Sequence, residues 1–154
     1  MRRKEKEIIG KEAIAAVIKS CQVCRLALID GNYPYVVPLN FGFEEGILYF
    51  HGAMRGKKLS LLQADSHAAF EMDTQLEVIE SEDACDWSMK FQSIVGRGRI
   101  SMIESPAEKK EALAVIMAQY SDKTFEFPDK PLSGTAVYKL TIEEMTGKEA
   151  GMAG

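Results

Sequence analysis

The stretch of residues 33–58 restricts the fold of this chain more than any other part of the sequence. Two runs rich in β-favouring residues, 35–43 and 47–51, are separated by a short segment that ends in Gly46. A connection of this length joins antiparallel neighbours, so the pattern predicts a β-hairpin. Pro38 lies in the middle of the first run, and proline cannot donate a hydrogen bond to a central ladder. We therefore expect an edge or a bulge at Pro38, where an open backbone edge can serve a ligand.

A histidine and two lysines follow the hairpin. His51 ends the second run, and Lys57 and Lys58 stand at the predicted start of a helix over 57–64. Backbone N–H groups at a helix start attract anions, and lysine side chains add positive charge. The arrangement therefore favours a site for a phosphorylated cofactor. The plainer alternatives are a solvated helix start for the lysines and a packed or surface role for the histidine.

Helix and strand patterns alternate along the rest of the chain. Apolar residues at helical spacing predict helices over 9–20 and 106–120, the second with Ser105 as its N-cap and Pro106 at its first position. An acidic, poorly periodic segment, 74–86, is predicted as a loop. Further strands are expected at 23–29, 68–73, 90–103 and 134–145, with Gly96 and Gly98 suiting a bulge in the third. About six strands and three helices predict a mainly β fold (β plus α), a six-stranded β-barrel with flanking helices.

Length and charge fit one domain over residues 1–154. A chain of 154 residues buries roughly 68–70% of its unfolded surface without disulfides or metals. The 19 basic and 23 acidic side chains give a net charge of −4, and a negatively charged protein is not attracted to nucleic acid. No apolar run approaches the ~20 residues of a membrane-spanning helix, and the charged residues near the start do not form a signal peptide. We expect a cytoplasmic protein with a small-molecule partner, no nucleic acid and no membrane.

The three cysteines predict neither a disulfide framework nor a metal site. Cys21 and Cys24 have the C-x-x-C spacing, but zinc needs two more ligands, and only Cys85, His51 and His67 remain, with no close pair among them. A redox pair opens a helix after a strand, whereas this pair lies between a helical pattern and a strand. We expect Cys21 and Cys24 to be small apolar residues and His67 to be structural. Cys85 has no visible base to make it a nucleophile.

Four groups of residues stand in an order typical of one protein family. They are YPYVVPLNF at 33–41, LYFHGA at 48–53 with GKKL at 56–59, CDW at 85–87 with FQSIVGRG at 91–98, and IEEMTGK at 142–148. Together they resemble the pyridoxamine 5'-phosphate oxidase-related flavoproteins, and among these the Nim-like branch, named for nitroimidazole resistance. The resemblance runs from about residue 10 to 148. It implies an FMN-binding split β-barrel that forms a homodimer, with the flavins in clefts between the subunits.

The resemblance also implies roles for individual residues. Lys57 and Lys58 would hold the flavin phosphate, and His51 would sit at the ring or the phosphate side. Ser93 and Val95 would approach the flavin from the facing subunit. The segment that would lie along the isoalloxazine ring, with backbone groups toward its polar edge, consists of Pro38, Leu39, Asn40 and Phe41.

Trp87 is the only tryptophan. Its large apolar surface predicts a core or interface anchor. A second role, as a wall of the substrate cleft, is also open.

The resemblance implies an FMN-dependent oxidoreductase that reduces a small electrophile, such as a nitroaromatic compound. A nicotinamide or a reduced partner protein would supply electrons. Gly96 and Gly98 are not followed by the third glycine of a dinucleotide fingerprint, so NAD(P)H would visit the flavin cleft only transiently. The alternative is a non-catalytic flavin, deazaflavin or haem-binding protein of the same fold, with His51 as an axial haem ligand. The sequence identifies no catalytic residue.

Overall fold

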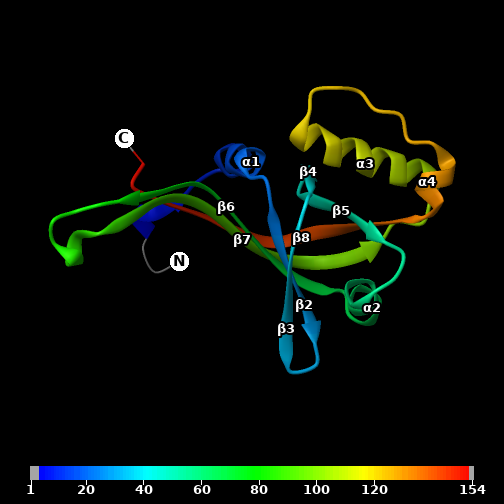
Figure 1. The fold of residues 1–154 in the computed structure, drawn as a ribbon, viewed down its shortest axis with the longest axis horizontal. Helices are drawn as coiled ribbons and strands as arrows, with labels where there is room; N and C mark the ends of the chain where they lie inside the picture. The colour runs from blue at the N-terminus through cyan, green and yellow to red at the C-terminus, as the bar shows by residue number, and fades with distance from the viewer. Residues whose placement is uncertain (1–3, 153–154) are drawn as a thin grey trace.

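The computed structural model describes residues 4–152 and is built around one antiparallel sheet (Figure 1). Its strands are β1 (Glu7–Ile8), β2 (Cys24–Asp30), β3 (Tyr33–Leu39), β4 (Gly42–Glu44), β5 (Ile47–Ala53), β6 (His67–Ile79), β7 (Ser88–Met102) and β8 (Thr135–Ala150). The α-helices are α1 (Lys11–Ser20), α2 (Lys57–Ala64), α3 (Pro106–Tyr120) and α4 (Asp129–Ser133). Two 3₁₀ turns, η1 (Lys4–Lys6) and η2 (Ala84–Asp86), complete the assigned elements.

The order of the strands makes the sheet curl into a split barrel. The order is β3-β2-β6-β7-β8-β5-β4, and β1 pairs with β8. The two edge strands, β3 and β4, are joined only by Asn40 and Phe41. Three steps between successive Cα atoms reach at most ~11 Å, so the two edges must lie near each other. The predicted mainly β, split-barrel fold is confirmed, and Asn40 and Phe41 mark the split.

Alternation along the strands separates a buried face from an exposed one. On β2, Cys24, Leu26 and Leu28 are buried, whereas the residues between them are more exposed. Apolar side chains of this kind gain roughly 1.5–3 kcal/mol each from leaving water. The inner face forms one core with residues from other elements, including Ile18, Phe41, Phe50, Phe70, Ile94 and Leu140.

The helices cover different parts of the sheet. In Figure 1, α3 lies across β4 and β5, while α1 lies over β6 and β7. Ser105 caps α3 as predicted, since its Oγ accepts a hydrogen bond from the N–H of Glu108 at 3.5 Å. None of the helices within residues 4–152 combines the length and the apolar character needed to cross a membrane.

The prediction of a loop over 74–86 is wrong in its first half. β6 continues to Ile79 and pairs with the start of β7, so that Val78 faces Met89. A register shift at Thr74 and Glu77 interrupts the pairing. The two strands form an arm that extends away from α3 and α4 (Figure 1). Both faces of this arm are largely exposed, and the short alternation of Leu76 and Val78 with polar residues lies within an acidic segment, whose composition predicts a loop.

Other boundaries also differ from those predicted. The run 35–43 is two strands, β3 and β4, because the chain crosses the split between them. The hairpin around Gly46 is confirmed, but it joins β4 to β5. The first helix begins at Lys11, β8 continues to Ala150, and α4 was not predicted, since five residues carry little periodicity. The described strands therefore number eight, not six.

Two local predictions about backbone geometry are confirmed. Pro38 lies on β3, which pairs only with β2 and is an edge of the sheet. The register between β7 and β8 shifts between Arg97 and Gly98. A Cβ atom built on Gly98 would lie 2.0 Å from the carbonyl oxygen of Thr141, so only glycine permits this approach of the two strands.

The cysteines lie where the sequence predicts. Cys21 and Cys24 are buried at the junction of α1 and β2. Burial raises the pKa of the Cys21 thiol to about 12 and raises that of Cys24 as well. Both thiols are therefore protonated and unreactive near neutral pH. Cys85 is exposed in η2.

Candidate functional site

The chain segment at the split of the barrel is held from outside by α3. Phe41 is fully buried, and its N–H donates a hydrogen bond to the Tyr120 hydroxyl at 3.0 Å. The same hydroxyl donates to the carbonyl oxygen of Gln22 at 2.9 Å. Pro38 and Asn40 are exposed beside this anchor. The open part of the predicted isoalloxazine segment is therefore 38–40, and Tyr120 fixes its far end.

The start of α2 leaves its N–H groups without a side-chain cap. The N-cap residue is Gly56, whose φ of 112° lies in a region that favours glycine. Glycine has no side chain with which to accept hydrogen bonds from the first turn. The helix has no acidic residue in that turn either. The positive end of the helix dipole is therefore available to an anion.

Lys57 already has partners within the protomer. Its ammonium forms an ion pair with the carboxylate of Asp30, at the end of β2. It also lies 5.5 Å from the centre of the Tyr35 ring on β3. These contacts hold α2 against the β2–β3 hairpin. An incoming phosphate would have to compete with Asp30 for this lysine.

Lys58 differs from its neighbour. Its Nζ lies 5.7 Å from the centre of the Tyr138 ring, and no carboxylate within residues 4–152 forms an ion pair with it. Partial burial lowers the pKa of Lys58. A half-buried ammonium without an anionic partner pays a desolvation cost that a bound anion would offset. Lys58 is therefore the stronger candidate for a phosphate ligand.

Tyr138 lies directly beneath Lys58. The residue is 1% exposed, and its ring stacks on Phe50 with ring centres 5.6 Å apart. Its hydroxyl is the one buried side-chain nitrogen or oxygen atom, in the part of the chain that the structure describes, without a hydrogen-bond partner. Burial raises the pKa of this hydroxyl, so it stays protonated.

Gly52 leaves room beside these two donors. A Cβ built on Gly52 would lie 3.0 Å from the Lys58 Nζ and 4.0 Å from the Tyr138 hydroxyl oxygen. Gly52 thus adjoins both polar groups. The three residues come from β5, α2 and β8. Each element supplies one part of a small polar niche.

His51 is next to Gly52 on β5 but points to the other face of the strand, because neighbouring side chains alternate. Its strand partner on β8 is Val137. Burial lowers the pKa of His51, and the positive charge of Lys58 lowers it further. The imidazole is therefore neutral at pH 7 and has nitrogen atoms free to accept or donate.

Ser93 and Val95 lie far from these residues. Ser93 pairs with Lys148 on β8, whereas His51 pairs with Val137, eleven positions earlier on the same strand. Eleven residues of extended strand cover ~36 Å of chain. Val95 is 52% exposed on the outer face. One protomer does not bring Ser93 and Val95 to the predicted flavin residues, so a shared site needs a second copy.

Trp87 lies at the end of the β6–β7 arm. It is 51% exposed, and its indole Nε1 donates a hydrogen bond to the carbonyl oxygen of Ser81 at 2.7 Å. The bond orients the ring while leaving much of it uncovered. The core role is wrong, since half of the side chain meets solvent. The roles of interface anchor and cleft wall remain predictions, and both need a partner.

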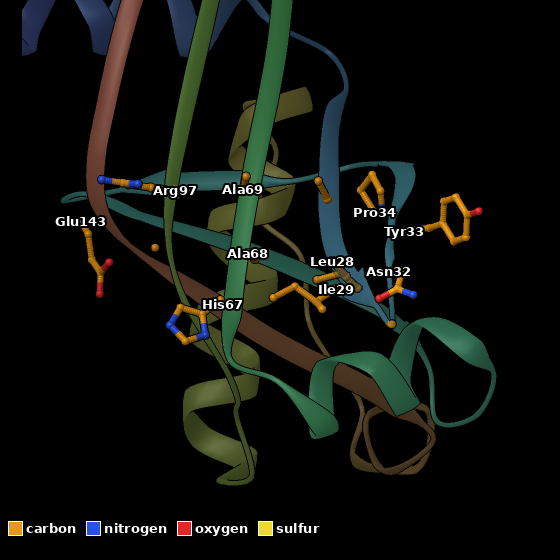
Figure 2. A pocket seen from close by; sticks show the side chains of 13 residues that line it. Leu28, Ile29, Asn32, Tyr33, Pro34, His67, Ala68, Ala69, Arg97 and Glu143 are labelled. Carbon is orange, nitrogen blue, oxygen red and sulfur yellow. The ribbon is translucent and has the colours of Figure 1, made fainter.

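A separate cavity of about 430 Å³ lies on the sheet around the β2–β3 turn (Figure 2). None of the predicted flavin residues lines it. Among the labelled residues of Figure 2, His67, Arg97 and Glu143 supply its polar side chains at one end. His67 has a partner that the sequence did not reveal, since its Nδ1 lies 2.7 Å from Asp65 Oδ1. Among residues 4–152, no group of three or more His, Cys, Asp and Glu side chains forms a metal site.

Sequence reasoning missed Tyr138, Gly52 and Tyr120. Tyr138 reads as one apolar position of an alternating strand, and Gly52 reads as one residue of a motif. Tyr120 is the last residue of a helix. A tyrosine in place of phenylalanine at a core position is the single available signal, because a buried hydroxyl needs a partner. The sequence does not tell where that partner lies.

Comparison with known families finds one match in this chain. The profile of the family described as pyridoxamine 5'-phosphate oxidase matches residues 10–149. No curated protein sequence matches the chain.

Several solved structures share the fold. A candidate 5-nitroimidazole antibiotic resistance protein from Bacteroides thetaiotaomicron is 31% identical, with a TM-score of 0.83 over 92% of this chain and 85% of that one. A flavocytochrome from Azotobacter vinelandii is 20% identical, with a TM-score of 0.84 over 99% and 72% of the two chains. An FAD and haem binding protein from Mycobacterium smegmatis is 18% identical, with a TM-score of 0.86 over 96% and 74%. The last two, at such low identity, show a common fold alone.

Proposed function

This chain belongs to the pyridoxamine 5'-phosphate oxidase family, in the branch that includes the Bacteroides protein, and from that premise we propose that it is an FMN-dependent oxidoreductase. Its oxidising substrate would be a small electrophile such as a nitroaromatic compound. Electrons would come from NAD(P)H, which visits the cleft transiently, or from a reduced partner protein. We place this activity in the cytoplasm, where reduced nicotinamides are made.

Lys58 is the observation that carries the proposal. Its ammonium is half-buried, lies at the uncapped start of α2 and, among the described residues, has no carboxylate partner. A phosphate monoester carries nearly two negative charges, which such a site is suited to bind. The residues present therefore fit the phosphate end of FMN. The exposed segment 38–40, at the split, would lie along the ring.

The protein's contribution would be to bind and orient the flavin. FMN supplies hydride and electron transfer when bound, so no nucleophile or paired carboxylates are needed from the chain. Lys58 would anchor the phosphate, and the backbone of Leu39 and Asn40 would face the polar edge of the ring. His51, neutral at pH 7, would offer a hydrogen bond on the other side of β5. The Tyr120 anchor would keep this frame rigid.

A homodimer completes the proposed site. Ser93 and Val95 belong to the family motif but lie too far along β8 to share a flavin with His51 of the same protomer. On the outer face of the sheet, Ile29, Val36 and Val95 are exposed apolar residues. Burial of this face against a second copy would remove them from water and would bring Ser93 and Val95 to the partner's flavin.

A visible absorption spectrum tests the proposal most directly. The purified protein, or the protein reconstituted with FMN, should show an oxidised-flavin spectrum that bleaches when NADH or NADPH is added without oxygen. A nitroimidazole added next should restore the oxidised spectrum. A flavin spectrum that never bleaches would leave a flavin-binding protein or one with another reductant. Failure to bind FMN at all would refute the proposal.

Haem binding is the second candidate, and one observation favours it. His51 is an exposed histidine whose lowered pKa keeps the imidazole neutral, as an axial haem ligand must be. A haem absorption band that disappears in His51→Ala would establish this function. Lys58, whose half-buried ammonium is suited to an anion, is the reason that we rank FMN first.

A further inference from the structure

The Tyr138 hydroxyl contributes nothing to the packing of the barrel. The ring alone stacks on Phe50 and lies beneath the Lys58 ammonium, so a phenylalanine would make the same contacts. The hydroxyl adds a polar atom, buried and without a hydrogen-bond partner. Buried polar groups of native proteins are nearly always paired, and exceptions mark a functional role or a missing ligand. The Tyr138 hydroxyl therefore needs a hydrogen-bond partner that residues 4–152 do not supply.

The surroundings of the hydroxyl define the chemistry of that partner. Lys58 is an obligate donor, and the raised pKa of Tyr138 keeps its hydroxyl protonated. No carboxylate within residues 4–152 pairs with Lys58. Two donors that converge without an acceptor between them fit an acceptor-only group that carries negative charge. A phosphate has three such oxygen atoms.

Gly52 keeps the space between the donors free. A Cβ at this position would lie 3.0 Å from the Lys58 Nζ, closer than ordinary contact, and would point toward the Tyr138 hydroxyl. Gly52 is at φ and ψ values of a β-strand, so backbone conformation does not require a glycine here. A side chain here would instead displace the Lys58 ammonium from its place beside Tyr138.

We propose that Tyr138 is a phosphate-binding residue: its hydroxyl and the Lys58 ammonium together hold the terminal phosphate of the flavin, in a niche that Gly52 keeps open. This inference rests on the proposed function, since it assigns a new residue to the cofactor site. Lys58 lies over the Tyr138 ring, and in the proposed complex its side chain shifts so that the phosphate contacts both the ammonium and the hydroxyl. The niche makes the protein select FMN over riboflavin, which has the same ring and no phosphate.

The ratio of FMN to riboflavin affinity tests the inference. Both dissociation constants are measured by flavin fluorescence for the wild type, Tyr138→Phe and Gly52→Ala. Tyr138→Phe should weaken FMN about tenfold, the usual range for one hydrogen bond to a charged group, and leave riboflavin unchanged. Gly52→Ala should likewise lower FMN affinity alone. Tyr49→Phe, on the opposite face of β5, is the matched control and should change neither.

Three results would overturn the inference. The first is an unchanged FMN affinity in Tyr138→Phe, and the second is an equal loss for FMN and riboflavin, which would mean a structural role. Thermal melting of each variant identifies one that has not folded, and Tyr138→Phe keeps every ring contact. If the wild type binds neither flavin, the proposed function fails separately. In that case inorganic phosphate is titrated into the protein and followed by NMR. Chemical-shift changes at Gly52 that disappear in Tyr138→Phe would support the niche. No such changes in the wild type would be the third result that overturns the inference.

Discussion

Replacing Lys58 by alanine should weaken FMN binding far more than the same change at Lys57. The two residues are the first two of α2, so both lie in the first turn at the positive end of the helix. They differ in their partners. Lys57 is 58% exposed and paired with Asp30, whereas the half-buried Lys58 has no carboxylate partner among the described residues. The pair is thus its own matched control.

The magnitude follows from these environments. A hydrogen bond to a charged group in a partly buried site is worth about 1.5–3 kcal/mol, so Lys58→Ala should raise the dissociation constant roughly ten- to a hundredfold. An exposed, already paired lysine contributes about 0.2–1 kcal/mol. Lys57→Ala should therefore raise the constant less than about fivefold. The effect of Lys57 should also fade with salt, because exposed charges are screened over ~10 Å at 0.1 M.

Equilibrium titration of FMN fluorescence at fixed ionic strength measures both variants against the wild type. Urea unfolding of each variant shows whether the fold survives the substitution. An unchanged dissociation constant in Lys58→Ala would rule out its phosphate role. If FMN affinity fell more in Lys57→Ala than in Lys58→Ala, the phosphate would have to displace Asp30 from Lys57. The argument that the lysine without a carboxylate partner binds the phosphate would then be refuted.

Three further predictions concern the frame around the site. Tyr120→Phe removes the acceptor of the buried Phe41 N–H and should lower the free energy of unfolding by about 1–3 kcal/mol in urea. Gly98→Ala forces a Cβ against a backbone oxygen at 2.0 Å and should cost about 3 kcal/mol or more, whereas Gly134→Ala, with its nearest contact at 3.6 Å, should stay within about 0.5 kcal/mol; equal melting temperatures would contradict this. Burial lowers the folded-state pKa of His51, so its contribution to stability is complete above the ordinary value of 6.5 and is lost as pH falls below it. The difference between the unfolding free energies at pH 7.5 and pH 5.5 should therefore be smaller in His51→Gln than in the wild type. An equal difference in both proteins would show that His51 is not its source.

The elements that carry a local sequence signal were predictable from the sequence. The hairpin at Gly46, the helix that Ser105 caps and the strand with Gly98 each carry a local signal that needs no distant partner. Pro38 even indicated an edge strand, because the missing N–H of proline is a property of the residue itself. The motif residues pointed to the family that the profile match confirms.

Local patterns failed where distant pairing decides the structure. The arm of β6 and β7 beyond residue 74 has no buried face, so its strands are held by the ladder between them, and the short alternation at Leu76 and Val78 does not outweigh the acidic composition of the segment. The run 35–43 divides at Asn40 because the two halves belong to opposite edges of the sheet. A pattern along one strand does not contain the order of the strands.

The sequence by itself determined the family, the alternation of the strands and the presence of two lysines at a helix start. Only the tertiary structure decided which lysine is free, because Asp30 at the end of β2 pairs with Lys57 on α2. It alone placed the Tyr138 hydroxyl of β8 beside Lys58 and Gly52, which lie about 80 residues earlier in the chain. Composition and spacing fix the chemical groups that a chain carries, whereas folding fixes which of those groups neutralise one another. The donors left without a partner, and therefore the candidate site, emerge from the second step.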